Sequence, residues 1–314
     1  MPDINFTDAQ QALGFINPQQ LRIETEVYQI KYPSFDYSRL MHVDTDGDMW
    51  DIGSVFFSGD IGGKAEFLSS KGFDMPFADI AQSQYLRQNQ LAGIGYEWSL
   101  GELQRAARLG QNLSASKASA ASRIAERFIY GIAISGHAEK GWTGLINDPN
   151  VPVATAAADG TGSATAWSTK TPDQINRDFN LVVEGVYNAS GETEIANRVL
   201  LPTSRLQYLA RTRIGDTTDT ILKFVRENNA YTAQTGQPLE IIGTRELAAA
   251  GAGGTARMMA YNNSKDVVQL HLPGPHEFLP AFQKSSMTWE VAGIMNVGGV
   301  EIRLPKGASY LDGI

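Results

Sequence analysis

The sequence predicts an α+β fold, organised as one large domain or two closely connected domains within 314 residues. A long helix is expected from about residue 114 or 116 to residue 135, because apolar side chains recur there with a 3.6-residue period. Short apolar segments separated by glycine and aspartate predict strands between residues 44 and 70. Helical and extended segments then alternate from residue 172 to residue 272, which is typical of a layer of mixed helices and strands.

Residues 1 to about 45 predict an extended arm with one short helix at most. They are polar, and Pro18 and Pro33 interrupt regular structure. Apolar and polar side chains alternate over residues 21–28, which favours a strand there. Because such a segment buries little apolar surface by itself, it either lacks a packed partner or lies on a neighbour.

A β-hairpin is expected to follow the arm. Residues 50–57 and 65–68 are its predicted strands, and the sequence SGDIGG at residues 58–63 is its predicted tip. A further extended segment, residues 91–98, leads out of this region.

Two helices come next. Ser99 and Glu102 have the spacing of a capping box, which predicts a helix to about Leu109 that ends at Gly110. The long helix that follows would form a rod of ~30 Å from some 20 residues, and Gly136 is placed to end it.

The rest of the chain alternates between loops, helices and strands. Residues 154–172 consist mainly of Ala, Gly, Ser and Thr, a composition that indicates a loop. The further elements expected are a helix from Pro172 to Tyr187, a strand at 198–201, a helix at 217–229, a strand at 239–242, and strands within 287–314.

Composition and charge exclude several classes of protein. The net charge of -8 argues against a dedicated nucleic-acid binder, which would need a basic surface. The sequence contains no cysteine, which excludes disulfides, thiolate metal sites and cysteine nucleophiles. Neither a signal peptide nor an apolar run of the ~20 residues that span a membrane is visible, so a soluble, unexported chain is expected.

One acidic segment could bind a cation. Asp44, Asp46 and Asp48 lie within five residues, but a calcium loop also needs glycine at position six and glutamate at position twelve. Those positions hold Met49 and Val55, so a solvated turn is the preferred interpretation. A metal-dependent enzyme that uses the three aspartates stays as an alternative.

Other catalytic and cofactor motifs fail on spacing or context. Gly62-Gly63-Lys64 lacks the glycine spacing of a phosphate loop and is followed by Ala65, which has no hydroxyl for magnesium. The glycines of residues 251–254 follow an alanine-rich stretch instead of a strand, and no His-Glu-x-x-His pair or Gly-x-Ser-x-Gly elbow occurs. We therefore predict no catalytic residue, no cofactor and no metal site, and no enzymatic activity.

Three stretches of the sequence resemble a known family. They are YEWSLGEL at residues 96–103, KGWTGLINDPNV at residues 140–151, and the chain end GGVEIRLP (298–305) with ASYLDGI (308–314). Their order and type are similar to those of the major capsid proteins of tailed bacteriophages, which share the Hong Kong 97-type fold with encapsulin shell proteins. The similarity extends over roughly residues 85 to 314.

The resemblance implies a specific layout. Residues 1–45 would be the N-terminal arm, and residues 46–98 the extended loop that reaches across an adjacent subunit. Residues 99–153 and 286–314 would form the peripheral domain with its long spine helix, and residues 154–285 the axial domain.

The resemblance also implies a function. Copies of the chain would assemble through hexamers and pentamers into the icosahedral capsid that encloses phage DNA, without sequence-specific DNA contact. Assembly would take place in the host bacterial cytoplasm, no membrane would take part, and scaffolding, portal or decoration proteins would be further partners. The alternative within this fold is an encapsulin-type shell that packages a cargo enzyme. A decoration or tail protein is a third interpretation, which the combined spine-helix and terminal-strand elements disfavour.

Aromatic side chains of the arm and hairpin are the expected contacts between subunits. They are Tyr28, Tyr32, Trp50, Phe56 and Phe57. For Trp50, a place in the core of its own domain is the competing interpretation. Lys64 lies where some shells of this type form a covalent lysine–asparagine link, but its asparagine and acidic helper are not matched here, and a solvated lysine is the simpler interpretation.

Overall fold

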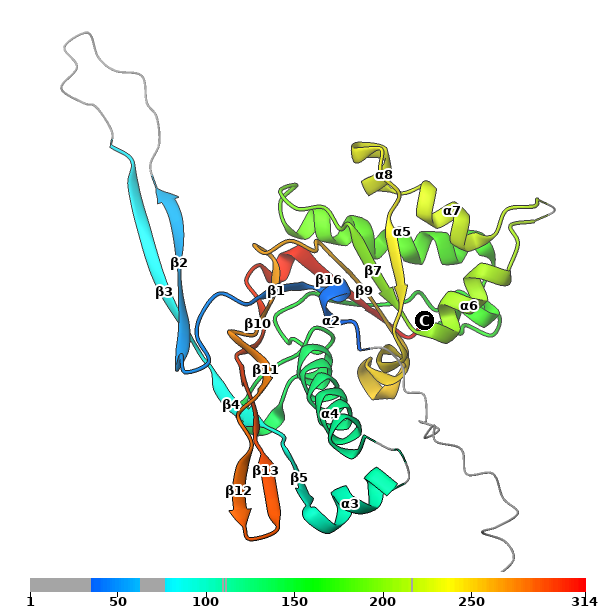
Figure 1. Cartoon of the computed structure of the whole chain (residues 1–314). Helices are drawn as coiled ribbons and strands as arrows, with labels where there is room; N and C mark the ends of the chain where they lie inside the picture. The colour runs from blue at the N-terminus through cyan, green and yellow to red at the C-terminus, as the bar shows by residue number, and fades with distance from the viewer. Residues whose placement is uncertain (1–34, 63–76, 109, 111, 216) are drawn as a thin grey trace, which may run out of the picture.

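A computed structural model describes residues 35–62, 77–108, 110, 112–215 and 217–314 of the chain. Packed sheets and helices form a body, and a two-stranded ribbon projects from it, β2 (Gly53–Gly62) paired with β3 (Asp79–Gln88) (Figure 1). The α+β class expected from the sequence is confirmed. The predicted strand at 21–28 lies outside the described residues.

A five-stranded mixed sheet lies at the centre of the body. Its order is β6 (Val153–Thr155), β16 (Ala308–Asp312), β9 (Arg257–Tyr261), β7 (Arg198–Leu201) and β8 (Glu240–Gly243). The C-terminal strand β16 is parallel to β6 and antiparallel to β9, and β7 is antiparallel to β9 and parallel to β8. The last strand of the chain therefore joins segments that precede it by some 50 to 150 residues.

The two faces of this sheet bury two separate apolar clusters, because side chains alternate along each strand. Met258 and Leu311 belong to the cluster that includes the buried side of helix α5 (Pro172–Ala189). Met259 and Tyr310 belong to the other cluster, which includes the buried side of α4 (Leu113–Ser135). The short helices on the α5 side are α6 (Thr203–Arg211), α7 (Ile221–Glu227) and α8 (Ala230–Thr235).

Three small sheets complete the α4 side. In the first, β10 (Val268–His271) lies between β1 (His42–Asp44), to which it is parallel, and the antiparallel β15 (Gly299–Ile302). The second has the order β11 (Gly274–Phe278), β14 (Gly293–Val297), β4 (Gln90–Gly93), and the third the order β12 (Phe282–Ser285), β13 (Thr288–Val291), β5 (Tyr96–Ser99). A short helix, α2 (Tyr37–Leu40), precedes β1.

The predicted helices at residues 99–109 and 114–135 are confirmed. The capping box before α3 (Leu100–Arg108) forms, since the Glu102 amide donates to Ser99 Oγ and the Ser99 amide donates to Glu102. Helix α4 begins one residue earlier than expected because the Asn112 side chain caps it. It ends at Gly136, whose φ of +72° favours glycine and where a Cβ would lie 2.1 Å from the Trp142 carbonyl oxygen.

The predicted hairpin is wrong in its extent. Residues 58–62, expected to be the tip, continue strand β2, and its partner is β3 instead of residues 65–68. Strand β3 was not predicted, because nine of its ten residues are exposed and an unburied strand needs no alternation of apolar and polar side chains. Residues 63–76 lie outside the described residues.

Two further differences concern the α5 side of the sheet. The helix expected at 217–229 is shorter and is followed by a second one, because Thr220 caps α7 and Asn229 caps α8. Helix α6 was not predicted. The helix from Pro172, the strands near 198–201 and 239–242, and the C-terminal strands are confirmed.

Candidate interaction surfaces

The projecting ribbon carries an open apolar face. Its ten residue pairs run without a bulge from Gly53 opposite Gln88 to Gly62 opposite Asp79, so alternate residues share one face. One face, which we call the open face, bears Val55, Phe57, Ile80 and Leu86, and these side chains are 44–67% exposed. No core formed by the described residues covers this face, so the ribbon offers an apolar surface to another molecule.

The opposite face of the ribbon is held to the body near its root. Phe56 stacks on Tyr85 with ring centroids 5.0 Å apart, and the Arg303 guanidinium lies 4.8 Å from the Phe56 ring. Arg87 Nε donates a hydrogen bond of 2.8 Å to the Gly298 carbonyl oxygen. These contacts fix the direction in which the ribbon leaves the body.

A buried histidine ties β1, the strand that leads into the ribbon, to the other two strands of its sheet. His271 on β10 lies 3.1 Å from Asp44 on β1 through Nδ1, and 2.8 Å from Glu301 on β15 through Nε2. Both ring nitrogens can donate to carboxylates only when both carry a proton. Burial would raise the pKa of Glu301, but hydrogen bonds from His271 and Arg303 outweigh it and lower that pKa.

The structure places three of the six predicted contact residues, and two of them are open to solvent. Trp50 is 66% exposed and Phe57 is 67% exposed, so Trp50 does not belong to the core of its own domain. Phe56 instead faces Arg303 of its own chain. Tyr28, Tyr32 and Lys64 lie outside the described residues, and whether any of the six contacts a second subunit stays a prediction.

The sheet β12–β13–β5 is a second projecting element, at the opposite end of the body from helices α5 to α8 (Figure 1). Phe282, the first residue of β12, is 71% exposed, and Met287, in the turn between β12 and β13, is 54% exposed. On β5, Tyr96 packs edge-on against Phe278 with ring centroids 5.3 Å apart. Sequence analysis did not single out this hairpin, because its two exposed apolar side chains form no periodic pattern.

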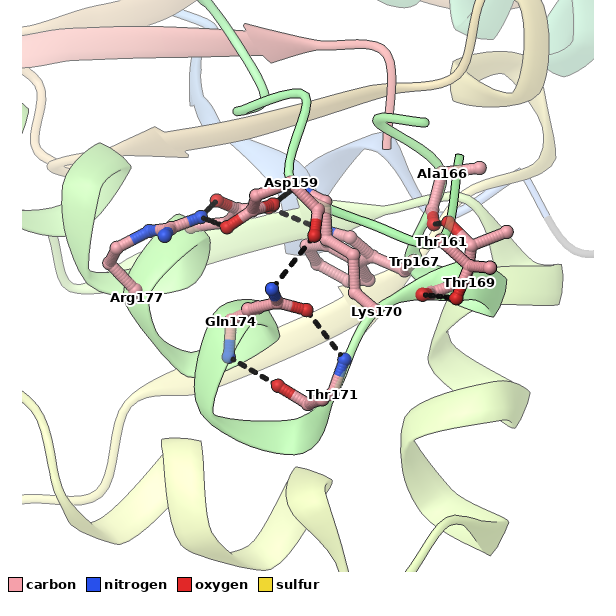
Figure 2. Close-up of polar contacts among 10 residues, drawn as sticks. Asp159, Thr161, Ala166, Trp167, Thr169, Lys170, Thr171, Gln174 and Arg177 are labelled. Carbon is pink, nitrogen blue, oxygen red and sulfur yellow. Dashed lines mark hydrogen bonds and ion pairs between the residues drawn. The ribbon is translucent and has the colours of Figure 1, made fainter. Parts of the chain in front are cut away.

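A polar network holds the loop that precedes α5, and it also escaped sequence analysis. The side chains of Lys170 and Asp178 are fully buried, with Lys170 Nζ 2.5 Å from Asp178 Oδ2 and 3.2 Å from Asp159 Oδ1. Figure 2 shows Asp159 between Lys170 and Arg177, whose guanidinium is 2.6 Å from Asp159 Oδ2. Trp167 Nε1 donates to Asp178 over 3.3 Å, so two cations and an indole N–H surround the two carboxylates.

The backbone of this loop is bound to the first turn of α5. Thr171 and Gln174 form a reciprocal capping box, and Gln174 Nε2 also donates to the Asp159 carbonyl oxygen over 2.9 Å (Figure 2). Partial desolvation would raise the pKa of Asp159, but hydrogen bonds from Arg177 and Lys170 outweigh it and lower that pKa. A loop of small residues, which composition alone would leave without structure, is thus held in one conformation.

The described residues do not bring three or more histidine, aspartate or glutamate side chains together in a way that could hold a metal ion. Of the three aspartates considered as cation ligands, Asp44 contacts His271 and the Asp46 amide. The Asp48 amide donates to the Asp51 side chain, so this segment is a hydrogen-bonded turn. Over the same described part of the chain, no helix is long and apolar enough to cross a membrane.

The sequence matches a protein family over most of its length. The family is described as "Major capsid protein", and the match covers residues 63–314. No curated protein matches the sequence significantly.

Solved capsid structures share the fold at low sequence identity. The capsid of Myoviridae phage XM1 is 15% identical, with a TM-score of 0.75 over 95% of this chain and 98% of that chain. The capsid of a native gene transfer agent particle is 10% identical, with a TM-score of 0.64 over 98% and 99% of the two chains. A structure from Microbacterium phage Oxtober96 is 11% identical, with a TM-score of 0.62 over 99% of both chains.

The structural matches confirm the Hong Kong 97-type fold that the sequence resemblance implied. They extend over nearly the whole of each chain, so the ribbon, the helices and the sheets are compared as one arrangement and not as isolated parts. The family match is a separate observation, because it rests on sequence. With both in agreement, this chain belongs to the major capsid protein family and is a structural subunit of a capsid.

Proposed function

We propose that copies of this chain form the icosahedral head shell of a tailed bacteriophage and enclose its packaged DNA. The observation that carries the proposal, beside family membership, is the open face of the ribbon. Its apolar side chains project from the body and are covered by no other part of the described chain. A shell subunit needs such surfaces, because each one becomes buried only against a neighbouring copy.

The ribbon is proposed to reach across an adjacent subunit within hexamers and pentamers. Trp50 and Phe57 are suited to this contact, because large exposed aromatic side chains contribute strongly when an interface buries them. The hydrogen bonds and the cation–π contact at the ribbon root support this function, since they set the direction of the ribbon before a neighbour binds.

Strand pairing supports a revised division into the two domains. We propose that the five-stranded sheet with α5 to α8 is the axial domain, and that α3, α4 and the three small sheets form the peripheral domain. In this division β10, β11 and β12 move to the peripheral domain, and the C-terminal strand β16 moves to the axial domain. The single boundary between residues 285 and 286 would then be replaced by two, near residues 264 and 307, and the segment between them would belong to the peripheral domain.

The contents and surroundings of the shell are part of the proposal. With a net charge of -8, the subunit is expected to enclose DNA without sequence-specific contact. Assembly in the host bacterial cytoplasm, and contact with scaffolding, portal or decoration proteins, follow from the proposed identity of the shell.

Electron microscopy of the purified protein in negative stain, with its sedimentation profile, tests the proposal. Closed polyhedral shells, or rings of five and six subunits, are the expected result. Nucleic acid in shells purified from infected cells would support a phage head, whereas a co-purifying enzyme would favour the encapsulin-type alternative. A monodisperse monomer or dimer across salt and protein concentration would contradict assembly.

A further inference from the structure

A groove on the exposed side of helix α4 is left open by the residues that the structure describes. The groove has a volume of about 500 Å³ and is lined by Ile124, Arg127, Phe128, Gly131, Ile132 and the turn after the helix. Ile124 is 52% exposed and Phe128 is 38% exposed. The two side chains lie one helical turn apart, so they form a continuous apolar strip along the helix. At Gly131 the groove is open, since a Cβ added there would meet no atom within 4 Å.

Basic side chains border the same groove. Arg127 lines it, and Arg123 is exposed one turn earlier on the helix. A segment that carries apolar and acidic residues would therefore complement the groove in both respects.

The described part of the chain begins beside this helix. The ring of Phe35 packs against Tyr130 of α4 with centroids 5.5 Å apart. Tyr130 is six residues from Ile124, which is about 9 Å along the helix axis. The 34 residues that precede Phe35 could span up to about 110 Å, so the groove is well within their reach.

The composition of these preceding residues fits the groove. Residues 1–21 include Asp3 and Asp8 and no lysine or arginine. The large aliphatic and aromatic residues after Met1 are Ile4, Phe6, Leu13, Phe15, Ile16 and Leu21. Their acidic and apolar character is complementary to the arginines and the apolar strip of α4.

We propose that the segment before Phe35 binds the α4 groove of its own chain. Its apolar side chains cover Ile124 and Phe128, and its carboxylates lie near Arg123 and Arg127. The proposal goes beyond shell formation, because it concerns a contact within a single subunit that exists before any neighbour binds.

Photochemical cross-linking in the full-length chain tests this contact. Phe128→p-benzoylphenylalanine places a reactive group in the groove, and peptide mapping after irradiation identifies what it captures. The expected product is a cross-link to a peptide from residues 1–34, formed within one chain. In an equal mixture of isotopically labelled and unlabelled chains, each cross-link should then join two labelled peptides or two unlabelled peptides, and never one of each.

A second position gives a matched control. Phe224 of α7 is 37% exposed, nearly the same as Phe128, and Phe224→p-benzoylphenylalanine should capture no peptide from residues 1–34. With the reactive group moved to Ile124, Arg123→Glu with Arg127→Glu should lower the cross-link yield about tenfold, equivalent to ~1.4 kcal/mol. Arg211→Glu, which lies on α6, should leave the yield unchanged.

Several results would overturn the proposal. Capture of residues 53–88 from a second chain would show that a neighbour's ribbon occupies the groove. Mixed isotope pairs would show that the N-terminal segment of another copy binds there. Absence of any captured peptide, with circular dichroism of the variant unchanged, would show that the groove is vacant in the subunit.

Discussion

Replacing Lys170 with methionine should destabilise the subunit strongly. The ammonium group of Lys170 is fully buried, 2.5 Å from the fully buried carboxylate of Asp178 and 3.2 Å from Asp159. Methionine has a similar length but no charge, so the substitution leaves a buried carboxylate without its nearest cation. Removal of one partner of a buried ion pair typically costs about 3–5 kcal/mol in the free energy of unfolding.

The remaining contacts of Asp178 place the expected cost near the lower end of that range. Arg177 still lies 3.0 Å from Asp178 Oδ1, and Trp167 Nε1 still donates to Oδ2. We therefore expect a loss of about 3 kcal/mol. Replacing the pair together, Lys170→Met with Asp178→Asn, should restore most of that loss, since no unpaired buried charge is left and the amide oxygen can still accept from Trp167 Nε1.

Urea denaturation of the unassembled subunit measures these changes, and the fluorescence of the buried Trp167 reports on the same region. Lys223→Met is the matched control. Its partner Asp219 is four residues away and both side chains are more than half exposed, so this substitution should leave the free energy of unfolding nearly unchanged. Equal losses for Lys170→Met and Lys223→Met would refute the reasoning, because the Lys170 pair would then contribute no more than a solvated one.

Three further predictions follow from single features of the structure. Trp50→Ala should change the free energy of unfolding by less than about 0.5 kcal/mol, because the ring is 66% exposed, yet impair assembly in sedimentation; normal shells would rule out Trp50 as a contact. Gly136→Ala should cost about 1–3 kcal/mol in thermal or urea unfolding, since φ is +72° and the Trp142 carbonyl oxygen occupies the Cβ position; a smaller loss would mean that this turn relaxes easily. Partial desolvation would raise the pKa of Asp312, but hydrogen bonds from Arg257 and the Ala252 amide outweigh it and lower that pKa. The ion pair of Asp312 and Arg257 should therefore stabilise the fold fully above the ordinary aspartate pKa of about 3.9 and lose this effect as the pH falls further. Asp312→Asn should flatten the acid limb of a plot of unfolding free energy against pH, and an unchanged slope would contradict the assignment.

Sequence patterns located the elements whose signals are local. The capping box of Ser99 and Glu102 depends on residues three apart, and it forms as expected. The 3.6-residue period of α4 survives because one side of that helix is buried along most of its length. Strand β3 lacks any such signal, because a ribbon without a core on either face places no demand on which of its residues are apolar.

The candidate contact surface was partly predictable for the same reason. Trp50 and Phe57 could be named from the sequence, because large aromatic residues in a region without helix or core pattern call for an explanation. Ile80 and Leu86 could not be assigned to the same face as Phe57, since that depends on a pairing register between strands separated by a long segment.

The sequence by itself determined helices α3, α4 and α5 and several of the strands. Through its resemblance to phage major capsid proteins it also determined the family and the fold. Only the tertiary structure decided which distant segments pair. It placed the C-terminal strand β16 between β6 and β9 and buried Lys170 against Asp178. Among the described residues, it also showed the α4 groove and the open face of the ribbon as exposed apolar surfaces. The physical reason is that propensity, capping and periodicity act between residues a few positions apart, whereas strand register and the burial of a charge depend on groups that only the folded chain brings into contact.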